Sequence, residues 1–136
     1  MTQQTMGLMD FVKAAKAAIT EIDCAQLEAL RRDRTNLMIL DVRESSEHEQ
    51  GHLESAILVP RGILEAAADA IYPKRVQQLV DGRERPIVLY CATGGRSAMA
   101  AATLKQMGFK EVYSLAGGIS QWSAENRPLV NEARYV

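Results

Sequence analysis

The chain has 136 residues, of which 47% are hydrophobic, and 16 Lys and Arg against 17 Asp and Glu give a net charge of -1. This length favours one domain with a core that needs no disulfide or metal staple. Two cysteines and two histidines lack the spacing of a zinc site, so we expect no metal and no cofactor. Scattered basic residues and 5% aromatic content argue against nucleic-acid binding, and the lack of about 20 consecutive apolar residues argues against a membrane span.

The amino-terminal segment predicts one helix and no targeting signal. Residues 1–10 lack a basic segment followed by an apolar one, so we expect no signal peptide and a cytoplasmic location with reduced thiols. Residues 8–19 place apolar side chains at the spacing of an amphipathic helix. We expect this helix to pack on the body of the domain rather than to dock a partner, so residues 1–19 form an amino-terminal extension.

Apolar strand-like segments alternate with helical ones along the rest of the chain. The predicted strands are residues 20–22, 37–40, 55–59, 86–90 and 111–113. The predicted helices are residues 24–32 (with Asp23 as N-cap), 62–71, 74–80 and 97–107, and a short helix opened by Gly117 and Gly118. Residues 44–51 are predicted to be a polar loop. The alternation implies an open, mostly parallel α/β sheet with helices on both faces.

The segment after the strand at residues 86–90 predicts a reactive cysteine. Cys91 follows that strand directly, and ligands of open α/β sheets bind beyond the carboxyl ends of the strands. Small residues that let backbone N–H groups turn toward one point come next: Ala92, Thr93, Gly94 and Gly95. Arg96 and the start of the helix at Ser97 add positive charge. These features lower the pKa of a thiol, so we expect Cys91 to be a thiolate nucleophile rather than an inert core cysteine.

The other residues that draw attention have structural interpretations. Cys24 lies in the first turn of a predicted helix, and we expect it to pack in the core rather than to pair with Cys91. A thiolate that already exists needs no base, so His52 is expected to stabilise a turn. His48 is expected to be solvated and Trp122 to be part of the core.

Five motifs, in order between about residues 20 and 127, resemble those of the rhodanese family of sulfurtransferases. They are Leu40-Asp41-Val42-Arg43-Glu44, then Gly51-His52-Leu53 with Ala56 and Val59-Pro60, then Cys91 to Ser97, then Gly108-Phe109 to Tyr113, and last Ala116-Gly117-Gly118-Ile119 with Trp122. The resemblance implies one rhodanese-like unit over residues 20–127 and a tail over residues 128–136. No room is left for the second domain of tandem relatives, so the active loop is expected to be open or covered by a partner.

The length of the loop bears on the chemistry that the resemblance implies. Four residues separate Cys91 from Arg96, as in sulfurtransferases of this fold, whereas related phosphatases and arsenate reductases have five. Ser97 stands where the arginine of the longer loop would be. The implied mechanism is ping-pong: Cys91 takes the outer sulfur of a donor, holds it as a persulfide against the N–H groups of residues 92–96, and passes it on.

Two departures from the family pattern concern the donor and acceptor. Ala92 and Thr93 are neutral where many relatives carry Arg or Lys, which disfavours thiosulfate as the main donor and favours a protein or small-thiol persulfide. Residues 65–71 offer no anion contact and are expected to shape the acceptor side. Asp41 and Arg43 are expected to organise the loops around the site, as supporting residues together with Ser97.

The sequence therefore predicts a rhodanese-type enzyme that moves sulfane sulfur through a Cys91 persulfide. Its expected partners are a small donor, thiosulfate or a persulfide, and a thiol or cyanide acceptor, with neither nucleic acid nor membrane. One alternative is a persulfide carrier that serves a protein partner. The others are arsenate reductase or phosphatase chemistry, which the short loop disfavours, and a non-catalytic binding module, which the presence of Cys91 and Arg96 disfavours.

Overall fold

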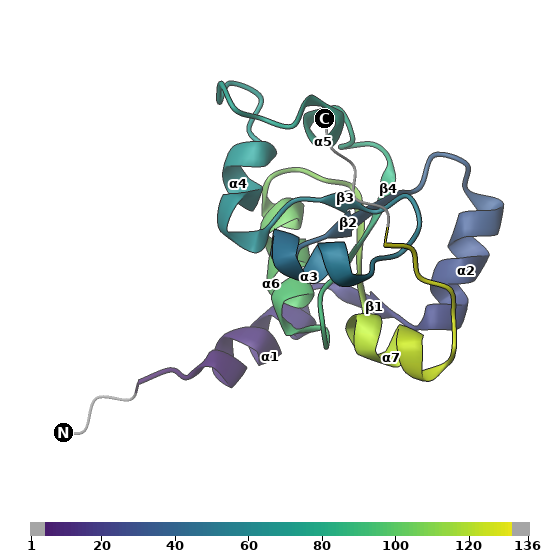
Figure 1. Cartoon of the computed structure of the whole chain (residues 1–136). Helices are drawn as coiled ribbons and strands as arrows, with labels where there is room; N and C mark the ends of the chain where they lie inside the picture. The colour runs from purple at the N-terminus through teal and green to yellow at the C-terminus, as the bar shows by residue number, and fades with distance from the viewer. Residues whose placement is uncertain (1–4, 132–136) are drawn as a thin grey trace.

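A computed structural model describes residues 5–131 and contains a five-stranded sheet in the order β1-β5-β4-β2-β3 (Figure 1). Every pairing in this sheet is parallel, which confirms the predicted α/β class. The strands are β1 (Thr20–Ile22), β2 (Met38–Asp41), β3 (Ile57–Leu58), β4 (Pro86–Tyr90) and β5 (Glu111–Leu115). Strands β2 and β4, at the centre, are buried along their whole length, as their unbroken apolar runs predict.

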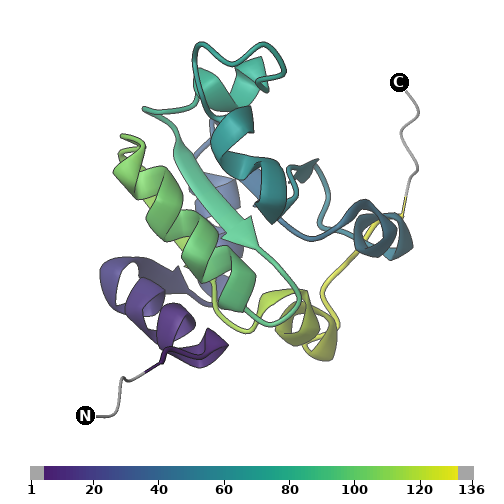
Figure 2. The same cartoon turned by 90° about the vertical axis from the view of Figure 1, so that its left-hand side faces the viewer.

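Helices cover both faces of the sheet, which lies between them in Figure 1, and Figure 2 shows the molecule from one of these faces. The helical elements are α1 (Leu8–Ala18), α2 (Cys24–Asp33), α3 (Ser45–Gln50), the 3-10 turn η1 (Arg61–Ile63), α4 (Leu64–Ala67), α5 (Gln77–Val80), α6 (Gly95–Gln106) and α7 (Gly118–Ala124). Leu89 of β4 faces a core that includes Leu104 of α6, whereas Val88 faces a core that includes Leu27 of α2 and Trp122 of α7.

The prediction of a polar loop at residues 44–51 is wrong, because Ser45–Gln50 form α3. The helix has no apolar stripe, and no residue of it is fully buried, so hydrophobic periodicity gives no signal. A capping contact explains its start: the Glu44 backbone N–H donates to the Glu47 carboxylate at 3.0 Å. Glu47 of this helix also forms an ion pair with Arg96, which follows the active loop.

Residues 62–80 contain less helix than the predicted spans 62–71 and 74–80. Only η1, α4 and α5 are helical there, and Ile71 between them is 87% exposed. The predicted strand 55–59 is likewise reduced to Ile57–Leu58, because Ser55 adopts a positive φ of 68° that ends extended structure before the strand begins. Strand β3 is the last strand of the sheet, whereas Leu64 of α4 and Leu79 of α5 pack in the core that includes Leu104 of α6.

Two features of the described residues bear on other functions. No helix between residues 5 and 131 is long and apolar enough to cross a membrane. Nor does this part of the chain bring three or more His, Cys, Asp or Glu side chains together as metal ligands.

Candidate active site

Cys91 directly follows β4, at the carboxyl edge of the parallel sheet, and a short loop connects it to α6. Its side chain belongs to the core beneath α6, and the residue is only 1% exposed. Gly94 turns the loop with a φ of 109°, a conformation that glycine adopts without strain. Helix α6 begins at Gly95, two residues before the predicted start, so its amino terminus lies closer to the sulfur than the sequence suggested.

Three hydrogen-bonding groups converge on the Cys91 Sγ atom. The backbone N–H of Gly94 donates to it at 3.1 Å and that of Ser97 at 3.4 Å. The Ser97 hydroxyl oxygen lies 3.5 Å from Sγ, and when the sulfur is a thiolate only this hydroxyl can be the donor. The same hydroxyl lies 2.9 Å from the hydroxyl of Ser114, a fully buried residue of β5 that the sequence analysis did not single out.

Opposing effects set the pKa of the Cys91 thiol. Burial raises the pKa, because a thiolate loses hydration in the core. Hydrogen bonds from the Ser97 side chain and from the backbone of Ser97, Gly94 and Thr93 lower it, and the net pKa falls below the ordinary value. Thr93 itself is exposed and Ala92 partly exposed, so the outer part of the loop presents no charge.

Helix α7 holds the other side of the loop. Its backbone N–H groups at Ile119 and Ser120 donate to the carbonyl oxygens of Cys91 and Ala92, at 2.9 and 3.0 Å. The approach is possible because Gly118 has no side chain: a Cβ atom there would lie 2.5 Å from both carbonyl oxygens. The glycine pair at residues 117 and 118 predicts this short helix but not its contact with the loop.

Arg96 does not stand alone beside Cys91. Its two terminal nitrogens donate to the two carboxylate oxygens of Glu47 on α3, at 2.9 and 3.0 Å. The Arg96 guanidinium holds the pKa of Glu47 at about 2, so this carboxylate stays charged at any neutral pH. Glu47 was missed by the sequence analysis because it lies 49 residues from Arg96, in the segment expected to be a loop.

Asp41, at the carboxyl end of the neighbouring strand β2, is the centre of a buried polar cluster. The Arg43 guanidinium donates to its two carboxylate oxygens at 3.0 and 2.8 Å, and the Tyr90 hydroxyl donates at 2.9 Å. Burial raises the pKa of Asp41, but the bonds from Arg43 and His48 outweigh it and keep the pKa low. Arg43 also donates to the Gly51 carbonyl at 2.7 Å, so the cluster joins β2 to the end of α3.

The expectation that His48 is solvated is wrong. Its ring stacks on that of His52 with 3.7 Å between centroids, and its Nδ1 atom lies 2.9 Å from an Asp41 oxygen. Nδ1 of His52 donates to the His48 carbonyl at 2.9 Å, which locks the turn after α3. A carboxylate seven residues earlier orders His48, and no local pattern signals that contact.

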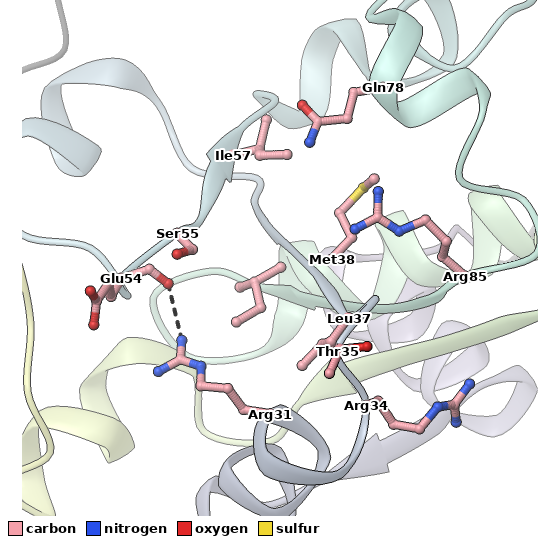
Figure 3. Close-up of a pocket in the computed structure, with 11 residues that line it drawn as sticks. Arg31, Arg34, Thr35, Leu37, Met38, Glu54, Ser55, Ile57, Gln78 and Arg85 are labelled. Carbon is pink, nitrogen blue, oxygen red and sulfur yellow. Dashed lines mark hydrogen bonds between the residues drawn. The ribbon is translucent and has the colours of Figure 1, made fainter.

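A separate cavity of about 330 Å³ lies at the opposite edge of the sheet (Figure 3). Leu37, Met38 and Arg85 line it, at the amino ends of β2 and β4, and Arg31 reaches across to the Glu54 carbonyl at 3.1 Å. Because Cys91 follows the carboxyl end of β4, the sheet separates this cavity from the loop. Cys24 is also remote from Cys91: it is 1% exposed, in the core of the other face, as expected for a packing residue.

Comparison with known proteins agrees with this geometry. The profile of the rhodanese-like domain family matches residues 23–125. The chain belongs to this family. It is 30% identical over 112 residues to a protein named sulfurtransferase from Allochromatium vinosum, a match that covers 82% of the chain and 95% of the relative. The resemblance to the rhodanese family that the sequence motifs indicate is therefore confirmed.

Relatives of other names share the same domain. A Bacillus subtilis protein with a provisional name as a sulfur carrier is 33% identical, over 80% of this chain and 54% of the relative. A tRNA uridine(34) hydroxylase of Escherichia fergusonii is 30% identical, over 85% of this chain but 31% of the relative. The chain thus spans about half the length of the Bacillus subtilis relative and about a third of the length of the Escherichia fergusonii relative.

Two solved structures are similar over most of the chain. One, from Rhodopseudomonas palustris CGA009, is described as a protein of unknown function and possible tyrosine phosphatase; it has a TM-score of 0.85, 30% identity, and coverage of 96% of this chain and 99% of its own. The other is the polysulfide-sulfur transferase homodimer of Wolinella succinogenes, with a TM-score of 0.69, 28% identity, and coverage of 91% and 87%. Both similarities agree with membership of the rhodanese-like domain family.

Proposed function

We propose that the protein is a sulfurtransferase that carries sulfane sulfur on Cys91 as a persulfide. The donor is thiosulfate or a persulfide, and the acceptor is a thiol or cyanide. The observation that carries the proposal is the convergence of N–H donors from Gly94 and Ser97 on a cysteine sulfur whose pKa is lowered. Residues 20–127 are the proposed catalytic unit, with extensions on both sides.

The first half-reaction loads the cysteine. The Cys91 thiolate attacks the outer sulfur of the donor, whose S–S bond breaks and leaves its electron pair on sulfite or on a thiolate. The outer sulfur then carries the negative charge of the Cys91 persulfide. Donors that already stabilise a thiolate, the loop N–H groups and the amino end of α6, stabilise this anion as well.

The second half-reaction removes the outer sulfur from the Cys91 persulfide. An acceptor thiolate or cyanide attacks the outer sulfur, and Cys91 leaves as a thiolate, which the same hydrogen bonds stabilise. Ala92 and Thr93 form the outer part of the loop without charge, and Arg96 is held at its base by Glu47. In this proposal Asp41 and Arg43 position the loop through β2 and α3 and take no part in the chemistry.

A carrier that hands its persulfide to a protein partner is the second candidate. Its support is the uncharged outer loop, which offers no cation to a small anionic donor, and the sulfur-carrier relative in Bacillus subtilis.

Phosphatase chemistry has less support. Only four residues separate Cys91 from Arg96, and Arg96 is occupied by Glu47 rather than free to bind a phosphate.

The mass of the intact protein after incubation with donors tests the proposal. We expect wild type to gain one sulfur atom from thiosulfate or from a small hydropersulfide, and Cys91→Ala to gain none. The gained sulfur should appear as thiocyanate when cyanide is added. Slow release to cyanide with fast transfer to a protein thiol favours the carrier, and absence of mass gain with every donor contradicts both candidates.

A further inference from the structure

The ion pair between Arg96 and Glu47 determines how much positive charge the loop can offer a substrate. Both terminal nitrogens of the guanidinium face the carboxylate, at 2.9 and 3.0 Å, in the two-point geometry that makes such pairs strong. Both side chains remain about one-third exposed. The pKa of Arg96 is raised by its hydrogen bonds to Glu47 and also by the charge of Cys91, so the pair lies close enough to the sulfur for their charges to interact. The pair is thus within reach of the substrate but offers it no free charge.

The second cation near the loop is compensated in the same way. Arg43 forms its two-point contact with Asp41 inside the protein, at 3.0 and 2.8 Å. Two arginines therefore face two carboxylates around Cys91, and Ala92 and Thr93 add no charge. What remains to attract an anion is the set of backbone N–H groups at the start of α6.

The two donor classes make different demands on such a site. Thiosulfate brings two negative charges toward a thiolate, and this repulsion is large unless a nearby cation offsets it. A hydropersulfide brings no negative charge as R–S–SH and one as R–S–S⁻, so it meets less repulsion than thiosulfate does. We propose that Glu47, by holding Arg96, makes the site select hydropersulfides over thiosulfate; the inference rests on the proposed sulfur transfer and names its donor class.

The favoured reaction is balanced without another reagent. The Cys91 thiolate attacks the outer sulfur of R–S–SH, and the donor S–S bond breaks with its electron pair leaving as R–S⁻. The products are Cys91–S–SH, which retains the proton, and one thiolate, so the total charge is unchanged. Ionisation of the new persulfide then places the negative charge among the loop N–H groups.

The response of wild type to salt is the first test. The donors are thiosulfate and the hydropersulfide of 2-mercaptoethanol, and the measured quantity is the rate of sulfur gain on Cys91 by intact mass at pH 8. If the site charge is compensated, salt screens the repulsion, and the thiosulfate rate rises about threefold or more between ionic strengths of about 0.01 and 0.3 M. The hydropersulfide rate should rise less, by about twofold at most, because this donor carries at most one negative charge. A thiosulfate rate that falls with salt overturns the proposal, because it reveals an uncompensated cation.

The second test removes the carboxylate that pairs with Arg96. Glu47→Gln removes one charge from α3, whereas Glu49→Gln, an exposed position on the same helix, removes the same charge without touching Arg96. We expect Glu47→Gln to raise kcat/KM for thiosulfate about tenfold, mainly through KM, and for the hydropersulfide less than about threefold. Glu49→Gln should resemble wild type, and Glu47→Asp, which keeps the charge, should retain much of the selectivity.

Failure of this proposal is distinguishable from failure of the proposed function. If Glu47→Gln changes kcat/KM by the same factor for both donors, or leaves both values unchanged, Glu47 does not set the selectivity, but the proposed sulfur transfer is unaffected. If neither donor loads Cys91 in wild type, sulfur transfer itself fails. Should Glu47→Gln not fold, as thermal unfolding would reveal, the sign of the salt effect in wild type still decides.

Discussion

At the scale of single residues, Cys91 shows how a buried sulfur can be made acidic. Burial alone would raise its pKa, and the fall depends on donors that are already aimed at Sγ before a substrate arrives. The backbone donors belong to the loop and cannot be removed by substitution. The Ser97 hydroxyl can, and it is the largest single effect that lowers the pKa. Ser97 is thus the residue at which the electrostatics of the site can be tested.

Ser97→Ala should raise the pKa of Cys91. A hydrogen bond to a charged group contributes about 1.5–3 kcal/mol, and at 3.5 Å we expect the lower end, or about one pKa unit. The thiolate exists above the pKa, so the rate of reaction with iodoacetamide should reach its midpoint about one unit higher in pH than in wild type. The rate against pH, with Cys91 identified by mass, measures the shift.

Ser114→Ala is the matched control for this substitution. Ser114 contacts the Ser97 hydroxyl at 2.9 Å but forms no hydrogen bond with the sulfur in the described structure. Its loss leaves the Ser97 hydroxyl in place, 3.5 Å from Sγ and 3.3 Å from the Gly94 carbonyl oxygen, so the midpoint should move by less than that of Ser97→Ala. Equal midpoints for wild type and Ser97→Ala would show that backbone donors alone set the pKa.

The sequence predicted some of these residues and not others for a physical reason. Cys91 and Gly94 lie in one short loop and Ser97 in the first turn of α6, so local rules about strand ends, glycine and helix starts identify them. Glu47 and Ser114 reach the site through tertiary contacts across 49 and 17 residues. Residues of that kind have no signature in a single sequence until the fold has brought their elements together.

At the scale of elements, two short helices, α3 and α7, hold the active loop. Helix α3 contributes Glu47 to Arg96, and α7 contributes two backbone N–H groups to the carbonyls of Cys91 and Ala92. Neither helix has the apolar periodicity of a longer one, which is why the polar helix α3 was expected to be a loop. The long helix α6 and the buried strand β4, in contrast, follow from their apolar patterns.

Gly118→Ala should displace the active loop. Gly118 has a φ of 56°, and a Cβ atom would lie 2.5 Å from the Cys91 and Ala92 carbonyl oxygens, so the backbone must move. We expect the free energy of unfolding to fall by about 2 kcal/mol or more, since strained backbone positions cost about 1–3 kcal/mol each. Sulfur gain on Cys91 should slow about tenfold to a hundredfold. Urea unfolding and intact mass measure the two effects.

Gly62→Ala provides the comparison for Gly118→Ala. A Cβ atom at Gly62 would meet nothing within 4 Å, and its φ is not positive, so both stability and sulfur gain should stay near wild type. If Gly118→Ala behaves like Gly62→Ala, α7 does not hold the loop in the geometry described.

At the scale of the whole molecule, the sheet separates two thiols and gives them different environments. Cys91 lies in the core under α6, and Cys24 lies in the core under α2 and α7. Each is 1% exposed, so burial does not distinguish them. The difference is what surrounds the sulfur: burial and the nearby Glu125 carboxylate raise the pKa of Cys24, despite an opposing effect of Arg127, whereas hydrogen bonds lower that of Cys91.

The folded protein should therefore behave as a one-thiol reagent. At pH 7.5 we expect iodoacetamide to label Cys91 faster than Cys24, because the pKa of Cys91 is lowered and that of Cys24 is raised, so that Cys91 has the larger thiolate fraction. Intact mass should show one label on the native protein and two after unfolding in guanidinium, while Cys91→Ala should show almost none until it unfolds. Equal labelling of both cysteines in the native state would contradict this division, since it would mean that the fold gives Cys91 no advantage as a nucleophile.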